Sequence, residues 1–456
     1  SNGYTTVYAH LKKYSNKIEA YIKKHQYEKE SFEIQLYPGP TELKLEKGEV
    51  IAYSGSTGGF VSPHLHFEVR DRNSKPINPM YFGITVNDDK SPRINTLMAY
   101  PLDDFSQVNQ SNIPLQIPFK TLESGTLLAD KITASGTIGF GVNTFDRLNG
   151  ALNKNGIFSL EMLVNGEKVY NHIAETFSFA ESKHINLLID YERYGKLNQR
   201  IQRCFVEPSN KLSIYRNVKD RGYLTIDAGM TYSVEIIAKD FKGNQSKLRI
   251  PIVGKNDTIT IPKEKKITQY PIIAKEFNKF TKDGVTIAFP KNTFYNDFYM
   301  NFDVKDGKAF IHKKIVPLDN KFTLTFDVSS YTSEEKKKLF IAGYSSKGYP
   351  RHNKTYKKEK TFYTTTKNLG EYTLLSDNKQ PILKLSNFKK NQWLSNYRQI
   401  VLKVSDDLSG LKSYRGEIDR QWILLEYSPK HSTLTYNFSD KKLISGKHTL
   451  NVIAID

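Results

Sequence analysis

Hydrophobic and polar residues alternate in short runs along most of the chain, as they do in strands that bury one face. The clearest run covers residues 322–328, which read Phe-Thr-Leu-Thr-Phe-Asp-Val. Runs of this kind predict a mostly β fold, with one charged helical stretch near residues 14–30. Strands are predicted at 4–11, 31–37, 49–54, 64–70, 135–145, 157–165, 232–253 and 322–328.

Turn-forming segments divide the chain into four predicted units. A polar run that closes on Pro92 separates the first unit from the second. The second and fourth units look like copies, because in each a strand runs into an Asp-containing turn closed by glycine, at 146–150 and 406–410. Short strands at this spacing predict immunoglobulin-like (Ig-like) β-sandwiches. The units span 1–86, 87–255 with an insertion near 185–222, 256–375, and 376–456, whose strand pattern is truncated.

Length and charge narrow the class of protein. The 456 residues fit several domains at roughly 100–200 residues each. The net charge is +19, but only 14 of the 67 basic residues are Arg and they are spread along the chain, so no nucleic-acid partner is expected. A solvated Lys-rich surface, or attraction to an acidic envelope polymer, fits better. No run of 18 apolar residues predicts a membrane span.

Both ends of the chain and its one cysteine carry further expectations. The first residues already read as turn and strand, and the last strand pattern stops at Asp456, where the copy in the second unit continues into a turn. We therefore expect a fragment that is truncated at both ends.

Cys204 is the single cysteine, which excludes an intramolecular disulfide and a thiolate zinc site. A buried, unreactive thiol is the favoured interpretation.

The residues most typical of chemistry follow a glycine-rich loop at 55–63. Side chains alternate between the faces of a strand, so His64, His66 and Glu68 are expected on one polar face. Imidazoles two residues apart can supply a metal ligand and a neighbouring base. Partly exposed strand histidines without a ligand are the alternative interpretation.

An earlier strand offers a similar polar face. Within the predicted strand 4–11, Tyr8 and His10 alternate with apolar neighbours and are expected to share one side. Three of the ten histidines thus lie on two strands, each of which has an apolar opposite face. The combination of the two strands with the glycine-rich loop favours a metal-dependent site.

These motifs together resemble the lysostaphin-like (beta-lytic) zinc metalloendopeptidase family. The resemblance covers about residues 1–86 and implies part of the peptidase β-fold, which is similar to a barrel-sandwich hybrid. A domain of this kind followed by about three Ig-like β-sandwiches resembles envelope proteins of Bacteroidetes-type bacteria. The shared motifs are, in order, Tyr8-Ala9-His10-Leu11, Lys47-Gly48, Ser54-Gly55-Ser56-Thr57-Gly58, Pro63-His64-Leu65-His66-Phe67-Glu68 and Asn78-Pro79.

The resemblance implies a role for each histidine. His66 corresponds to a zinc ligand, while His10 and His64 correspond to two catalytic imidazoles beside the metal. One would take a proton from zinc-bound water and the other would stabilise the oxyanion, and the sequence leaves open which does which. The implied substrate groove contains Tyr8, for which a packing role is equally open, and loop residues Ser56, Thr57 and Gly58.

Three features depart from the family pattern. The His-x-x-x-Asp motif that supplies the other two zinc ligands would precede Tyr8, and the chain does not contain it. Ser62 stands where the family often has glycine, and a long charged insertion separates Leu11 from Lys47. This insertion is expected to be a solvated helical flap, or alternatively part of the groove rim. We therefore expect weak zinc binding and no turnover by this chain.

The predicted function belongs to the parent protein. It is zinc-dependent endopeptidase activity on the peptide part of bacterial peptidoglycan, in the cell envelope or after secretion. The β-sandwiches would position the catalytic unit or bind envelope proteins or glycans. One alternative is a degenerate, non-catalytic peptidase fold that activates or tethers other cell-wall enzymes. Another is a carbohydrate-binding surface protein.

Overall fold

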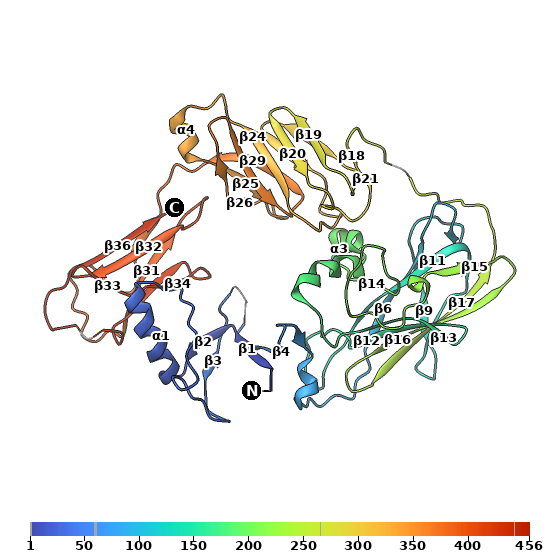
Figure 1. The fold of residues 1–456 in the computed structure, drawn as a ribbon, viewed down its shortest axis with the longest axis horizontal. Coiled ribbons are helices and arrows are strands. Elements are labelled where there is room, and N and C mark those ends of the chain that lie inside the picture. Colours follow the sequence, from blue (N-terminus) through green and yellow to red (C-terminus); the bar gives the residue numbers. More distant parts are fainter. Residues whose placement is uncertain (1, 59–61, 265, 442) are drawn as a thin grey trace.

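The computed structural model describes residues 2–58, 62–264, 266–441 and 443–456 (Figure 1). The chain is a mostly β protein with several separate sheets, which confirms the predicted fold class at this level. The sheets follow one another along an arc, so that the last ones (red) lie beside the first helix, α1 (Asn16–Lys29). Within the described residues, no helix has the length and apolar character needed to cross a membrane.

Residues 2–82 form a three-stranded sheet, of order β1-β4-β5, and a separate two-stranded sheet of β2 and β3. This region has little core of its own. Among its described residues, Val69 is the one hydrophobic side chain that is buried. The elements are β1 (Thr5–Ala9), β2 (Leu11–Tyr14), α1, β3 (Ala52–Ser54), β4 (His66–Arg70), β5 (Pro76–Ile77) and the 3-10 helix η1 (Pro79–Phe82).

Several predicted elements of this region are shorter than expected. The predicted strand 4–11 is interrupted at His10, which has a φ of 59°. The strand predicted at 64–70 begins at His66, while His64 forms an isolated bridge with Gly55. Residues 31–37 form no strand, because no neighbouring strand pairs with them; instead the side chain of Gln26 donates to the Phe32 carbonyl.

Residues 93–254 contain the largest sheet system, with twelve strands and the central order β13-β12-β16-β17-β11-β6-β8. Alternate residues of β11, β12, β16 and β17 fill one core, which confirms the strands predicted at 135–145, 157–165 and 232–253. Cys204 is buried there, and this burial raises the pKa of its thiol. The strands are β6 (Arg93–Pro101), β7 (Gln107–Val108), β8 (Leu115–Ile117), β9 (Phe119–Thr121), β10 (Leu127–Ala129), β11 (Ile132–Phe145), β12 (Ser159–Val164), β13 (Glu167–Ile173), β14 (Gln202–Arg203), β15 (Leu224–Ile226), β16 (Thr231–Lys239) and β17 (Gln245–Gly254).

The predicted insertion carries the helices of this region. It leads from the sheet toward the next part of the chain, where Lys183 Nζ lies 2.5 Å from Asp319 Oδ1. The rings of His184 and Tyr295 pack with their centroids 5.8 Å apart. The helices are η2 (Phe179–His184), α2 (Ile185–Leu188), α3 (Tyr191–Leu197) and η3 (Asp220–Gly222).

Residues 271–376 form two five-stranded sheets, β19-β20-β24-β28-β27 and β22-β23-β29-β25-β26. Side chains from both sheets belong to one hydrophobic cluster, so the sheets pack face to face as a β-sandwich. The elements are β18 (Pro271–Ile272), β19 (Asn278–Lys282), β20 (Val285–Phe289), β21 (Phe298–Tyr299), β22 (Phe302–Lys305), β23 (Lys308–Ile311), β24 (Phe322–Asp327), α4 (Ser333–Lys338), β25 (Leu339–Tyr344), β26 (Pro350–His352), β27 (Tyr356–Lys357), β28 (Thr361–Thr366) and β29 (Gly370–Ser376).

Residues 382–455 repeat this arrangement with a four-stranded and a three-stranded sheet around a third cluster. They also contact α1: Lys23 Nζ lies 2.5 Å from Asp440 Oδ1, and the Tyr27 and Trp422 rings meet edge to face at 5.2 Å. The charged insertion therefore packs against the last sheets. The strands are β30 (Ile382–Leu385), β31 (Gln399–Ser405), β32 (Ser413–Ile418), β33 (Gln421–Trp422), β34 (Glu426–Ser428), β35 (Thr433–Asn437) and β36 (Leu450–Ile455).

Candidate functional site

The three histidines singled out in the sequence meet where β1 ends and the paired strand β4 begins. The ring centroid of His10 lies 4.9 Å from that of His64 and 5.6 Å from that of His66. We call these three side chains the histidine cluster. It is open to solvent, since 45% of the His66 side chain is exposed.

A backbone irregularity brings His10 into the cluster. The antiparallel register pairs Ala9 with His66 and Tyr8 with Phe67, so Tyr8 lies on the opposite face from His66. Continued alternation would place His10 on the face of Tyr8. Instead His10 adopts a left-handed conformation, with a φ of 59°, and its ring packs beside His66.

The prediction that Tyr8 shares a face with His10 is therefore wrong, because the strand ends between them. The Tyr8 ring packs against Phe67 with centroids 5.4 Å apart. Of the two interpretations left open by the sequence, this contact favours packing over a place in the groove.

Backbone carbonyls orient two of the imidazoles. His10 Nδ1 lies 2.8 Å from the Thr57 carbonyl oxygen, and His64 Nδ1 lies 3.0 Å from that of Ser62. A carbonyl oxygen can only accept a hydrogen bond, so each Nδ1 carries the proton in the neutral ring. Nε2 then holds the lone pair, which is the form of imidazole that can accept a proton or bind a metal.

A carboxylate orients the third imidazole, and it contacts Nε2 of that ring instead of Nδ1. His66 Nε2 lies 2.7 Å from Glu68 Oε1, and Arg70 Nε donates to Glu68 Oε2 at 2.7 Å. The hydrogen bond from Arg70, followed by that from His66, holds the pKa of Glu68 below its ordinary value. No described residue hydrogen-bonds His66 Nδ1. A carboxylate behind one ring nitrogen is the arrangement that orients metal-binding histidines.

The predicted loop supports His10. Thr57 accepts its hydrogen bond, and a Cβ added to Gly58 would lie 3.3 Å from His10 Nδ1. Gly58 also has a φ of +81°, a conformation that favours glycine. Ser56 is half-buried in the same loop. Residues 59–61 of the predicted loop lie outside the described residues.

The histidine cluster does not form a complete zinc site from the described residues. Catalytic zinc needs three protein ligands around one ion. Among the described residues, the His, Cys, Asp and Glu groups whose ligand atoms all lie within 4.8 Å of one another are two sets of three aspartates, and neither includes a histidine. The cluster therefore offers His66 as an oriented donor without the partners that would complete the coordination.

Sequence reasoning missed two features. Alternation placed Glu68 on the face of His66, but the ion pair with Arg70 that fixes it was not expected. The two aspartate sets were also missed, although the sequence held a signal. Both contain the Asp of an Asp-containing turn, Asp146 or Asp406, whose recurrence identified the second and fourth units as copies.

Comparisons with known proteins give one family match. The family described as Zu5-like domain matches residues 269–377, the range that holds the two five-stranded sheets. No curated protein matches the chain. A solved structure of the N-terminal eight Ig domains of Down Syndrome Cell Adhesion Molecule, isoform 1.30.30, is 8% identical. The match covers 90% of this chain and 79% of that one, with a TM-score of 0.15.

Proposed function

We propose that residues 1–86 are part of a lysostaphin-like zinc endopeptidase unit and that the parent protein acts on the peptide part of bacterial peptidoglycan. The observation that carries this proposal is the convergence of His10, His64 and His66, each with one ring nitrogen fixed by a hydrogen bond. These histidines come from two segments that both match the family motifs. The exposure of the cluster allows a polymer to reach it.

The histidines of this chain are held in fixed orientations by hydrogen bonds, and their imidazoles can accept and donate protons. In His10 and His64 the hydrogen-bonded nitrogen is Nδ1, so Nε2 is the basic nitrogen. In His66 the nitrogen that contacts Glu68 is Nε2, so Nδ1 is the basic nitrogen. Because the described ligands do not complete a zinc site, we assign no hydrolytic step to them. We propose weak zinc binding through His66 and no turnover by this chain.

A second candidate is a degenerate, non-catalytic peptidase fold that activates or tethers other cell-wall enzymes. In both cases we propose a bacterial envelope or secreted location. The Ig-like sandwiches would then position the first unit or bind envelope proteins or glycans. The net charge of +19 supports contact with acidic envelope polymers.

The test measures zinc and peptidoglycan binding by the full chain. Calorimetric titration with ZnCl2 is expected to give weak binding that His66→Ala removes. His25→Ala is the matched control, because His25 lies on α1 and pairs with Glu28. Purified peptidoglycan should sediment the chain, and replacing His10, His64 and His66 together with Ala should reduce this binding.

The outcomes separate the candidates. Release of soluble peptides from peptidoglycan would show that the chain is itself an enzyme, against our proposal of no turnover. Tight stoichiometric zinc binding would contradict the incomplete site. Peptidoglycan binding that is unchanged by the triple substitution would overturn the role of the histidine cluster, and glycan binding that also survives deletion of residues 1–86 would identify a carbohydrate-binding surface protein.

A further inference from the structure

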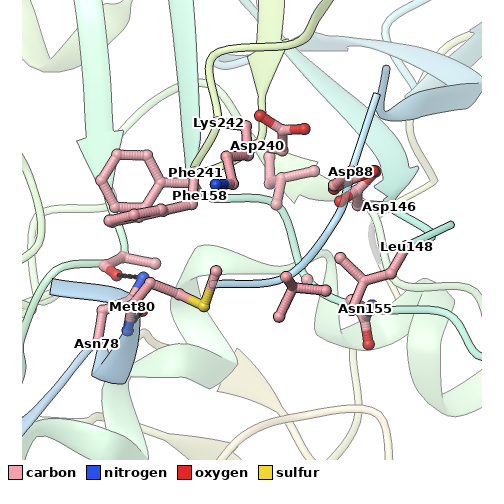
Figure 2. A pocket seen from close by; sticks show the side chains of 14 residues that line it. Asn78, Met80, Asp88, Asp146, Leu148, Asn155, Phe158, Asp240, Phe241 and Lys242 are labelled. Carbon is pink, nitrogen blue, oxygen red and sulfur yellow. Dashed lines mark hydrogen bonds between the residues drawn. The ribbon is translucent and has the colours of Figure 1, made fainter. Parts of the chain in front are cut away.

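Three aspartates from separate segments meet where the first unit joins the twelve-stranded sheet. Asp88 lies in the linker before β6, Asp146 directly follows β11, and Asp240 directly follows β16. One carboxylate oxygen from each lies within 4.8 Å of the other two. Figure 2 shows all three among the side chains that line one pocket. We call them the aspartate triad.

The triad places negative charge at a buried position, where water cannot fully solvate the carboxylates. Asp146 is 4% exposed and Asp240 is 5% exposed. Among the described residues, no Lys, Arg or His forms an ion pair with any of the three, although Lys242 also lines the pocket. Burial, together with the charges of Asp88 and Asp240, raises the pKa of Asp146. Buried carboxylates without a counter-charge are costly unless they coordinate a metal.

One oxygen of the triad has no partner. Asp146 Oδ1 is fully buried and accepts no hydrogen bond from the described residues. Such orphaned oxygens are uncommon in native proteins and call for an explanation, such as a bound ion. The carboxylate belongs to a rigid segment, because the Asp146 backbone exchanges two hydrogen bonds with Asn155.

The other two aspartates are held by a common neighbour. Asn244 donates to Asp240 Oδ1 through its backbone at 2.9 Å and to Asp240 Oδ2 through its side chain at 2.6 Å. The same side chain also donates to the Asp88 carbonyl at 3.2 Å. Each carboxylate oxygen keeps a second lone pair for another interaction. The β16–β17 turn therefore fixes Asp240 beside the linker that carries Asp88.

The pocket has room to complete a coordination shell. Its volume is about 210 Å³, and Asn78, Leu148 and Asn155 contribute to its walls. An ion at the centre of three oxygens that all lie within 4.8 Å of one another is at most about 2.8 Å from each of them, close to the roughly 2.3–2.6 Å of Ca²⁺–oxygen bonds. Waters and side-chain oxygens could supply the remaining ligands.

The same arrangement occurs a second time in the chain. Asp377, Asp406 and Asp456 also bring carboxylate oxygens within 4.8 Å of one another, and Asp406 Oδ1 likewise has no partner. The positions correspond to those of the triad, since Asp88 and Asp377 each begin an Asp-x-Lys-x-Pro segment. Asp146 directly follows β11, and Asp406 directly follows β31. Asp240 and Asp456 each end an Ile-Ala-x-Asp sequence.

We propose that the aspartate triad binds Ca²⁺. Three carboxylates form a hard, oxygen-only donor set, which suits Ca²⁺, whereas zinc prefers nitrogen and sulfur ligands. Mg²⁺ demands a near-ideal octahedron and keeps its waters, while Ca²⁺ accepts six to eight oxygens in irregular geometry. Such an ion would offset most of the negative charge of the three carboxylates and satisfy Asp146 Oδ1.

The ion would also join two parts of the chain. Residues before Asp88 already dock on the sheet system: Asn78 N donates to the Glu175 carbonyl at 2.8 Å, and Thr176 Oγ1 donates to the Pro76 carbonyl at 2.9 Å. A cation shared by the linker and two strand ends would stiffen this junction. Ca²⁺ would thus fix the orientation of the first unit on the twelve-stranded sheet.

The test uses the full chain after removal of metal with a chelator. Calorimetric titration with CaCl2 should show binding, and Asp146→Asn should lower the stoichiometry by one equivalent. Asp130→Asn is the matched control, because Asp130 is exposed and does not belong to either set of three aspartates. Ca²⁺ should slow hydrogen exchange of residues 86–91 at least tenfold in the wild type and in Asp406→Asn, but not in Asp146→Asn.

Each other outcome decides against the site. Absence of Ca²⁺ binding, or an unchanged stoichiometry in Asp146→Asn, would overturn the proposal. Equal protection by Mg²⁺ at the same concentration would overturn the choice of ion. If Asp146→Asn does not fold, Asp88→Asn provides the same test at the half-exposed linker position.

Discussion

The histidine cluster and the aspartate triad differ in how far their side chains are exposed to solvent. The histidines lie on a three-stranded sheet with almost no core of its own, and 45% of the His66 side chain is exposed. Asp146 and Asp240 lie at the ends of strands of the twelve-stranded sheet, beside Asp88 of the linker, and Asp146 is 4% exposed. Exposure suits groups that must meet a large substrate, whereas burial of like charges suits a permanently bound ion.

The two sites also differ in how their side chains are held. Each histidine of the cluster has one nitrogen engaged by a carbonyl or by Glu68, so polar contacts help to orient the cluster. The aspartate triad is carried by strands with a large hydrophobic core, in addition to the hydrogen bonds from Asn244 that hold Asp240. Mutations that remove packing should therefore affect the triad, and mutations that remove polar contacts should affect the cluster.

The largest effect is expected from Phe140→Ala in β11. Phe140 is fully buried, and removal of a buried Phe side chain costs about 3–5 kcal/mol of the free energy of unfolding. Hydrogen exchange of β11 and β17 amides should report this loss, while β1 and β4 should be unchanged. Phe105→Ala is the control, because Phe105 is 88% exposed. Equal loosening of both regions would mean that the sites are not independently supported.

A smaller effect is expected from Glu68→Gln. The neutral amide loses most of its attraction for the His66 ring and its ion pair with Arg70. Loss of such a supporting carboxylate typically weakens metal binding about 10- to 100-fold. Calorimetry with ZnCl2 should show this decrease, whereas Glu28→Gln, beside His25, should leave zinc binding unchanged. Unaltered affinity in Glu68→Gln would show that polar contacts do not set the orientation of His66.

The smallest effect is a difference in the pH dependence of local stability without metal. The pKa of Glu68 is lowered, so its stabilisation is present above the ordinary value of 4.5 and is lost as pH falls through the folded-state pKa. The pKa of Asp146 is raised, so its destabilisation grows as pH rises from 3.8 through the folded-state pKa. On acidification, hydrogen-exchange stabilities should fall in β4 and rise in β11. Glu68→Gln and Asp146→Asn should each remove one trend, and trends of the same sign would contradict this assignment.

The sequence indicated the histidine cluster because its residues belong to short local motifs. The position of His10 could not be predicted, since strand alternation gives the wrong face and contains no sign of the left-handed backbone at His10. Residues 31–37 had the alternation of a strand but lack a partner to pair with. Pairing is a tertiary property, which alternation alone does not contain.

The aspartate triad could not be predicted from the sequence, because it too depends on tertiary structure. The turn at Asp146 and the Ile-Ala-x-Asp ending at Asp240 were both visible as repeated features. Their meeting with Asp88 depends on the register of β16 and β17 and on the path of the linker. By contrast, four strands of the twelve-stranded sheet, β11, β12, β16 and β17, lie where strands were predicted, because their buried faces repeat every second residue.

The contact between α1 and the last sheets has a consequence for the order in which the molecule is built. Lys23 and Asp440 are 417 positions apart. At roughly 5–20 residues per second, about 20–80 s of translation separate the two ends of this ion pair. During that time α1 has neither Asp440 nor Trp422 as a partner. The segment that carries the histidines is synthesised before the last sheets, yet its helix reaches its final packing only after those sheets have been made.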